Sequence, residues 1–195
     1  MATTAAPSGL KPVGLLGGRP YTGTVRQVPI SSAYGTSIFN GDVVYLAGGY
    51  CNKSTDTSSI TSGKAPVGVF LGCSYTDPVL GFVQRQYWPA STATVSGTPI
   101  VAYVCDDPDA VFQVQSSGSI AQATQGYNVP LVQNSGSTAT GDSKVAVGSA
   151  ATTNTLPLKI VDFVNGPFSA VGDSYTDVLV VWNGVHAYRT ALGNT

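Results

Sequence analysis

The chain has 195 residues, of which 43% are hydrophobic and only 10% are charged, and its formal net charge at pH 7 is -1. Ordinary soluble domains carry about 25% charged residues, so this surface is poor in charge. The hydrophobic content is enough for a sizeable core and excludes wholesale disorder. The nine Lys and Arg residues form no basic stripe, so we expect neither nucleic acid nor an anionic membrane as a partner.

The acidic residues are all Asp, because the chain contains no Glu. Glu favours helices, whereas the Gly, Pro, Ser, Thr and Asp that are abundant here favour turns, caps and strand ends. The composition therefore predicts an all-β protein, whose body is a β-sandwich or jelly roll or a β-barrel. So little surface charge is typical of a β protein that a partner partly covers, and we expect a structural or binding role.

Residues 1–24 are predicted to form an extended N-terminal arm, ahead of a β-rich body over residues 25–195. Gly and Pro recur along the arm and disfavour both a helix and a central strand. Its apolar side chains are too many for a plain linker, so we expect them to lie in a groove of a partner. The candidate contact residues are Leu10, Pro12, Val13, Leu15 and Leu16. The alternative, that the segment packs back on its own body, stays open; under the arm hypothesis, a chain lacking residues 2–16 still folds.

Turn residues punctuate the chain regularly from residue 25 onward and mark ten short strand candidates. These span residues 25–30, 42–47, 66–74, 81–88, 99–106, 110–115, 128–133, 144–147, 158–164 and 176–187, the last with a candidate break at Asn183-Gly184. Residues 134–155, rich in Ser, Gly, Thr and Ala, hold only one of these candidates. We interpret them as a long excursion from the core, with a flexible loop as the alternative.

The three cysteines, Cys51, Cys73 and Cys105, are odd in number, far apart and without a nearby His pair. This pattern argues against a disulfide framework or a zinc site, so we expect free thiols that act as small apolar residues, and neither a metal nor a cofactor. The chain begins without the basic and apolar regions of a secretory signal, and no apolar run approaches about 20 residues. We expect a soluble protein that is made in a cytosol.

Two Gly-Asp-Ser triplets, at residues 141–143 and 172–174, echo the start of an esterase motif, and Asp177 with His186 would complete a catalytic set around Ser174. A G-x-S-x-G elbow and a strand-helix scaffold are both missing from the pattern, so we expect no catalytic residue and no enzyme activity. His186 is instead interpreted as a strand histidine. The acidic run over residues 106–109 could hold calcium, but it lacks the glycine and the distal acid of an EF-hand loop, and a turn between two strands is the preferred interpretation.

Five segments carry a family resemblance through their order and spacing. They are residues 6–13 (APSGLKPV), 38–44 (IFNGDVV), 66–75 (PVGVFLGCSY), 87–89 (YWP) and 102–109 (AYVCDDPD). Together they resemble the capsid cement, or decoration, proteins of tailed bacteriophages, especially those of phages that infect cyanobacteria and other aquatic bacteria. The likeness covers most of residues 6–110 and, more loosely, residues 172–188.

The resemblance implies an all-β virion protein that binds the outer surface of the major capsid protein shell, stabilises the expanded head and performs no catalysis. Capsid symmetry makes a homo-oligomer the expected unit, with a trimer favoured and a dimer as the alternative. The arm residues are then the predicted capsid contacts. The competing hypothesis is a carbohydrate- or receptor-binding β domain displayed on the virion, with Tyr87-Trp88 and Trp182-Asn183 as candidates for stacking on sugars.

Overall fold

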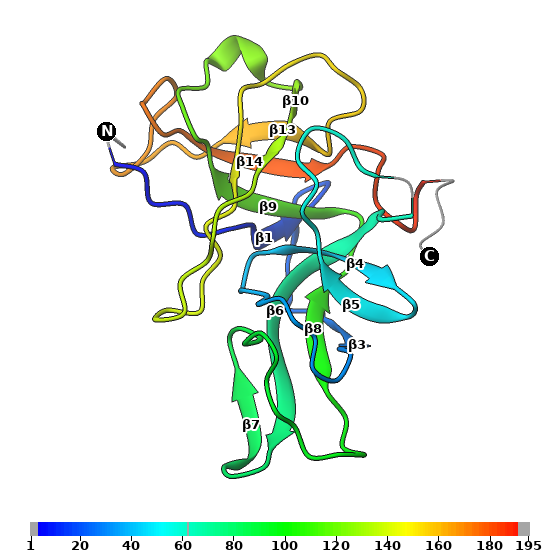
Figure 1. The fold of residues 1–195 in the computed structure, drawn as a ribbon. Coiled ribbons are helices and arrows are strands. Elements are labelled where there is room, and N and C mark those ends of the chain that lie inside the picture. The colour runs from blue at the N-terminus through cyan, green and yellow to red at the C-terminus, as the bar shows by residue number, and fades with distance from the viewer. Residues whose placement is uncertain (1–3, 62, 191–195) are drawn as a thin grey trace.

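The computed structural model describes residues 4–61 and 63–190, so residues 1–3 of the predicted arm and residues 62 and 191–195 of the predicted body lie outside the described residues. The predicted all-β fold is confirmed: the sheets are antiparallel, and the described chain holds a single short helix, the 3₁₀ turn η1 at Gln122–Thr124. Two six-stranded sheets pack against each other (Figure 1), and neither closes into a barrel within the described residues. The architecture is therefore a β-sandwich.

The first sheet, which we call the terminal sheet, joins strands from both ends of the chain in the order β10-β13-β14-β9-β1-β2. Its strands are β1 Lys11–Leu15, β2 Arg19–Pro20, β9 Ala110–Gln115, β10 Asn128–Val129, β13 Leu158–Phe163 and β14 Asp177–Trp182. In β13, Leu158 and Ile160 are buried while Lys159 between them is exposed. This alternation is expected because only one face of the sheet is covered.

The second sheet, the central sheet, has the order β3-β8-β6-β4-β5, and β7 pairs with the far half of β6. Its strands are β3 Arg26–Pro29, β4 Val43–Ala47, β5 Tyr50–Lys53, β6 Pro66–Asp77, β7 Gly81–Arg85 and β8 Val101–Cys105. Val69 of β6 packs in the core that reaches the terminal sheet, whereas Phe70 packs in a separate cluster. Both faces of β6 are thus covered, which explains its nearly continuous apolar sequence.

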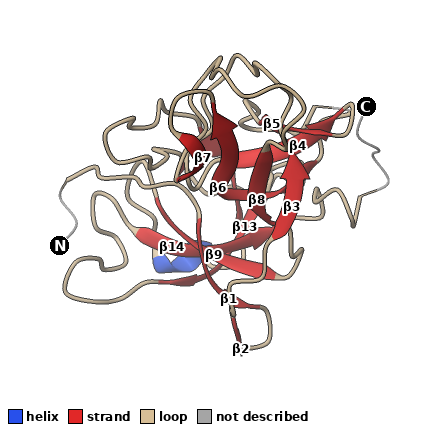
Figure 2. Ribbon diagram, turned by 90° about the horizontal axis from the view of Figure 1, so that it is seen from below, coloured by secondary structure: helices blue, strands red, loops and turns tan. Residues whose placement is uncertain are grey.

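Two hydrophobic clusters hold this arrangement together. The larger lies between the sheets and joins Val69 of the central sheet to Phe112 and Val180 of the terminal sheet. The second lies on the other face of the central sheet, where loop residues such as Trp88 cover Phe70. Seen from below, the two sheets form separate layers (Figure 2).

The N-terminal segment does not stand apart from the body. β1 pairs with β9, with Lys11 opposite Gln113 and Leu15 opposite Ala110, and β2 folds back on β1. Pro12 is tolerated because β2 pairs only with the end of β1, and a register shift follows Pro12. The segment therefore packs on its own body, and the expectation that a chain lacking residues 2–16 still folds loses its support.

Each of the ten predicted strand segments contains part of an observed strand, and residues 110–115 match β9 from end to end. Strands β1, β2 and β5 were not predicted, because Gly and Pro interrupt or bound their short sequences. The excursion over residues 134–155 leaves the body after β11, Leu131–Val132, and returns through its partner strand β12, Ala146–Val147. Its far part is not a free loop, since the Gln86 amide donates to the Asp142 carboxylate at 2.8 Å.

Candidate functional site

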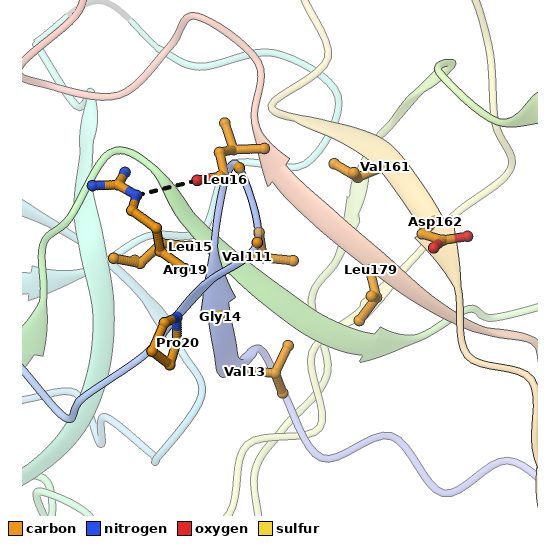
Figure 3. A pocket seen from close by; sticks show the side chains of 12 residues that line it. Val13, Gly14, Leu15, Leu16, Arg19, Pro20, Val111, Val161, Asp162 and Leu179 are labelled. Atoms are coloured by element: carbon orange, nitrogen blue, oxygen red, sulfur yellow. Dashed lines mark hydrogen bonds between the residues drawn. The ribbon is translucent and has the colours of Figure 1, made fainter.

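An apolar groove lies on the open face of the terminal sheet, where the turn between β1 and β2 stands beside β13 and β14 (Figure 3). Its volume is about 430 Å³. Val111 of β9, Leu179 of β14 and Val161 of β13 line it opposite Leu16 of the turn. Side chains from several strands thus form one concave apolar surface, which is the general form of a binding site.

The turn that forms one wall of the groove is Leu16-Gly17-Gly18. Both glycines have positive φ, 81° and 74°, a backbone conformation that other residues adopt at a cost. The Leu16 amide donates to the Asp109 carbonyl at 2.9 Å, and the Arg19 Nε donates to the Leu16 carbonyl at 3.3 Å. These hydrogen bonds hold the turn in position at the edge of the groove.

The five residues predicted as arm contacts occupy different environments. Leu10 has no exposed surface and packs in the core between the sheets, so it is unavailable to a partner in this conformation. Pro12 is half-buried within β1. Val13 is 48% exposed, and it lines the groove together with the half-buried Leu15 and Leu16. Of these last three, Leu15 also packs against the core between the sheets, so Val13 and Leu16 are the two that belong to a surface that could bind another molecule.

The same sheet face becomes polar beyond the groove. Lys11, Gln113, Gln115 and Asp177 line a smaller hollow there. The Gln113 amide reaches the Asp177 carboxylate at 3.5 Å, and burial raises the pKa of Asp177 above its usual value despite this hydrogen bond. The open face therefore has an apolar part and a polar part.

A second candidate surface is the hairpin formed by β6 and β7, which projects from the central sheet on the side away from the terminal sheet (Figure 1). Three apolar residues at its end, here called the tip patch, are among the most exposed of the described chain: Val79 is 90% exposed, Leu80 66% and Phe82 72%. Large apolar side chains grouped on a protruding element mark an interaction site more often than scattered ones do.

Hydrogen bonds hold the backbone of the turn at the tip. The Asp77 carboxylate accepts hydrogen bonds from the amides of Val79 at 2.8 Å and Leu80 at 3.0 Å, and these bonds lower the pKa of Asp77. Gly81 closes the turn with a φ of 77°. A strand was predicted after this turn, but the tip patch was not predicted as a site. The available signal was a turn in which the residues after Asp77-Pro78 are apolar instead of polar.

The acidic run at residues 106–109 forms the turn between β8 and β9, as preferred from the sequence. Arginines surround it: Arg26 pairs with Asp106, while Arg19 and Arg189 pair with Asp109. The carboxylates thus pair with arginines of β2, of β3 and of the segment after β14. Within residues 4–61 and 63–190, no group of acidic, His or Cys side chains could hold a metal ion.

The catalytic set considered from the sequence does not come together. Ser174 is exposed ahead of β14, Asp177 begins this strand and His186 lies beyond its end. Five residue steps along β14 span about 16 Å, so His186, which contacts Trp182, is far from Asp177. His186 is also not a strand residue as interpreted: it is fully buried in a turn, where its Nδ1 accepts the Tyr188 amide hydrogen bond at 3.3 Å.

The serine of the other Gly-Asp-Ser triplet belongs to a buried hydrogen-bond network. The Ser143 hydroxyl donates to the Asp42 carboxylate at 2.6 Å, and Lys53 pairs with the same carboxylate at 2.9 Å. Asp42 and Ser143 are both fully buried. A buried ion pair with each oxygen occupied ties the returning end of the excursion to β5.

The two tryptophans considered for sugar stacking are buried in the core. Trp88 has no exposed surface and Trp182 is 6% exposed, so neither ring can present a face to a ligand. Tyr87 stacks on Phe39 with ring centroids 5.3 Å apart. The two tryptophans are therefore core residues, whereas Tyr87 is half-buried and has one ring face covered by Phe39.

All three cysteines are free and buried, as expected from the sequence. Burial raises the pKa of the Cys51 and Cys73 thiols to about 12. The thiols therefore stay protonated and act as apolar residues.

Comparisons with family models, curated protein sequences and solved structures found no match for this chain. Among the described residues, no helix is both long and apolar enough to cross a membrane.

Proposed function

We propose that this protein is a structural virion protein that binds the outer surface of the major capsid protein shell and stabilises the expanded phage head. The order of the five segments that resemble decoration proteins supports this proposal. The observation that carries it is the tip patch, because Val79, Leu80 and Phe82 are exposed together at the end of a projecting hairpin.

Exposed apolar surface costs free energy in water. Each exposed square ångström of the tip patch gains about 25 cal/mol when a partner covers it, so seating the hairpin in a groove of the shell stabilises the complex. The Asp77 hydrogen bonds hold the turn before binding, which reduces the entropy lost on association. With charged residues at only 10%, few polar groups need to be desolvated around the contact.

In this proposal the capsid contact is the tip patch, and the protein works by holding neighbouring capsid subunits together against the outward pressure of packaged DNA. It resides on the outer surface of the virion after synthesis in the host cytoplasm. It needs no cofactor, no nucleic acid and no membrane, and it acts without enzymatic turnover.

The test mixes the purified full-length protein with expanded heads that lack it, and follows both saturable binding and the temperature at which the heads rupture. Wild type is expected to bind at a fixed ratio to capsid subunits and to raise the rupture temperature. Leu80→Asp places a charge in the tip patch and should weaken binding at least tenfold, the effect of losing a central contact residue.

The matched control is Phe168→Asp, which changes a side chain that is 85% exposed in the loop between β13 and β14, on the terminal sheet. It should bind heads as wild type does. Absence of wild-type binding would overturn the proposed function, and equal binding by Leu80→Asp would overturn the role of the tip patch.

A further inference from the structure

We infer that the open face of the terminal sheet is a two-fold self-association surface, in which the grooves of two copies of this chain meet with Arg19 of each copy opposite Asp162 of the other. This inference is independent of capsid binding, because it concerns a different sheet from the tip patch and is tested on the purified protein alone.

The outer face of the terminal sheet carries apolar surface that the rest of the described chain leaves uncovered. The inner face of the terminal sheet is fully used by the core, where Phe112, Val178 and Val180 are buried. On the outer face, Val13 is 48% exposed, and Val161 and Leu179 are only half-buried. No other segment of the described chain fills the groove between them. A sheet with an apolar strip on its outer face is stabilised when that strip packs against a second sheet.

The second step is the placement of charge. Figure 3 shows Arg19 on one side of the groove and Asp162 on the opposite side. The Arg19 side chain is 61% exposed even though it also pairs with Asp109 at 3.5 Å, so donors of its guanidinium remain accessible. Asp162 is exposed, and its Oδ1 accepts a hydrogen bond from the Phe163 amide at 2.8 Å, while no other described residue bonds its carboxylate.

These two features select a second copy over other occupants. A two-fold axis through the groove exchanges its two walls, so a cation on one wall and a carboxylate on the other make the surface complementary to itself. The same contact forms twice in such an interface. A net charge of -1 per chain adds little repulsion between copies.

The size of the face sets the expected strength. Six strands about 4.8 Å apart and about 16 Å long give a projected face of roughly 400 Å² per copy. Stable complexes bury about 800 Å² per partner, so the sheet face must be supplemented by the surrounding loops. We therefore expect reversible dimerisation in the micromolar range and not a permanent dimer.

The experiment is sedimentation velocity on the purified full chain across concentrations from about 1 to 200 μM, a range chosen to bracket micromolar affinity. Wild type should shift from monomer to dimer. Leu179→Lys places a charge in the groove and should weaken dimerisation more than tenfold. Leu80→Asp, in the tip patch, should leave it unchanged, which separates this inference from the capsid proposal.

A charge exchange gives the sharper test. Arg19→Asp and Asp162→Arg should each weaken self-association about tenfold, because each puts like charges at both contacts. An equimolar mixture of the two variants should recover the wild-type affinity, since every contact in the mixed dimer again joins opposite charges. Thermal melting of each variant confirms that it is folded.

A wild-type protein that stays monomeric throughout the range would overturn the inference. So would a mixture of the two charge variants that associates no better than either variant alone, or dimerisation that Leu179→Lys leaves intact.

Discussion

The two sheets of this molecule have the same number of strands but differ in how their faces are covered. The central sheet has a hydrophobic cluster on each face, whereas the terminal sheet has a core on one face and an open groove on the other. Side chains of β6 therefore have structural roles on both faces. Along β14, by contrast, Val178 and Val180 support the fold while Leu179 between them is available to a partner. Whether a side chain supports the fold or is a candidate for binding therefore depends more on the face of the sheet on which it lies than on the strand to which it belongs.

The largest effect should come from removing a core side chain of the central sheet. Phe70→Ala is expected to lower the free energy of unfolding by about 3–5 kcal/mol, because the ring is fully buried and leaves a cavity. The matched change on the open face, Leu179→Ala, should cost about 1 kcal/mol or less. Urea unfolding at low protein concentration measures both without a contribution from self-association. Equal losses would mean that the two faces are not distinguished in this way.

The next prediction compares a buried residue with an exposed one within the N-terminal segment. Leu10→Ala should destabilise the fold by about 2–5 kcal/mol, since Leu10 is fully buried between the sheets. Val13→Ala, three residues later and 48% exposed, should stay within about 0.5 kcal/mol of wild type. Thermal unfolding of the two variants side by side measures this. Unchanged stability of Leu10→Ala would restore the hypothesis of a separable arm.

Much of the fold could be predicted from the sequence, because turn residues bound short apolar runs and alternation marks strands with one buried face. Residues 110–115 were predicted as a strand and match β9 for this reason. β1 escaped prediction because its Pro and Gly residues weaken local strand propensity, and its pairing with β9 is a contact across about a hundred residues of sequence that only the tertiary fold supplies.

The candidate site was harder to predict for a related reason. Leu10 and Val13 are both apolar residues in the same stretch, and nothing local says that one points into the core and the other into the groove. The tip patch left a clearer trace, since Val79 and Leu80 stand in a turn where polar residues are the rule. The groove itself combines β1, β9, β13 and β14, so no single segment of sequence encodes it.

The smallest effect concerns the junction of the two sheets. His186 follows β14 of the terminal sheet, and the amide of the next residue, Ala187, donates to the Pro66 carbonyl at the start of β6, 2.8 Å away. Burial lowers the pKa of His186, and the Val67 carbonyl with the carboxylates of Asp106 and Asp107 opposes this shift only in part, while Arg189 adds to it. Below the usual His pKa of about 6.5, the unfolded chain therefore binds a proton that the folded chain resists.

Stability is consequently expected to fall as the pH drops from about 6.5 through the lower pKa of the folded state, by at most about 1.4 kcal/mol per pH unit. His186→Gln, which offers an acceptor to the Tyr188 amide, should remove this slope. Unfolding curves at several pH values between about 5 and 7 make the comparison. Asp177 cannot imitate the effect, because its raised pKa makes the folded state gain stability on acidification. If wild type and His186→Gln lose stability equally over this window, the His186 junction is not the acid-sensitive element that joins the sheets.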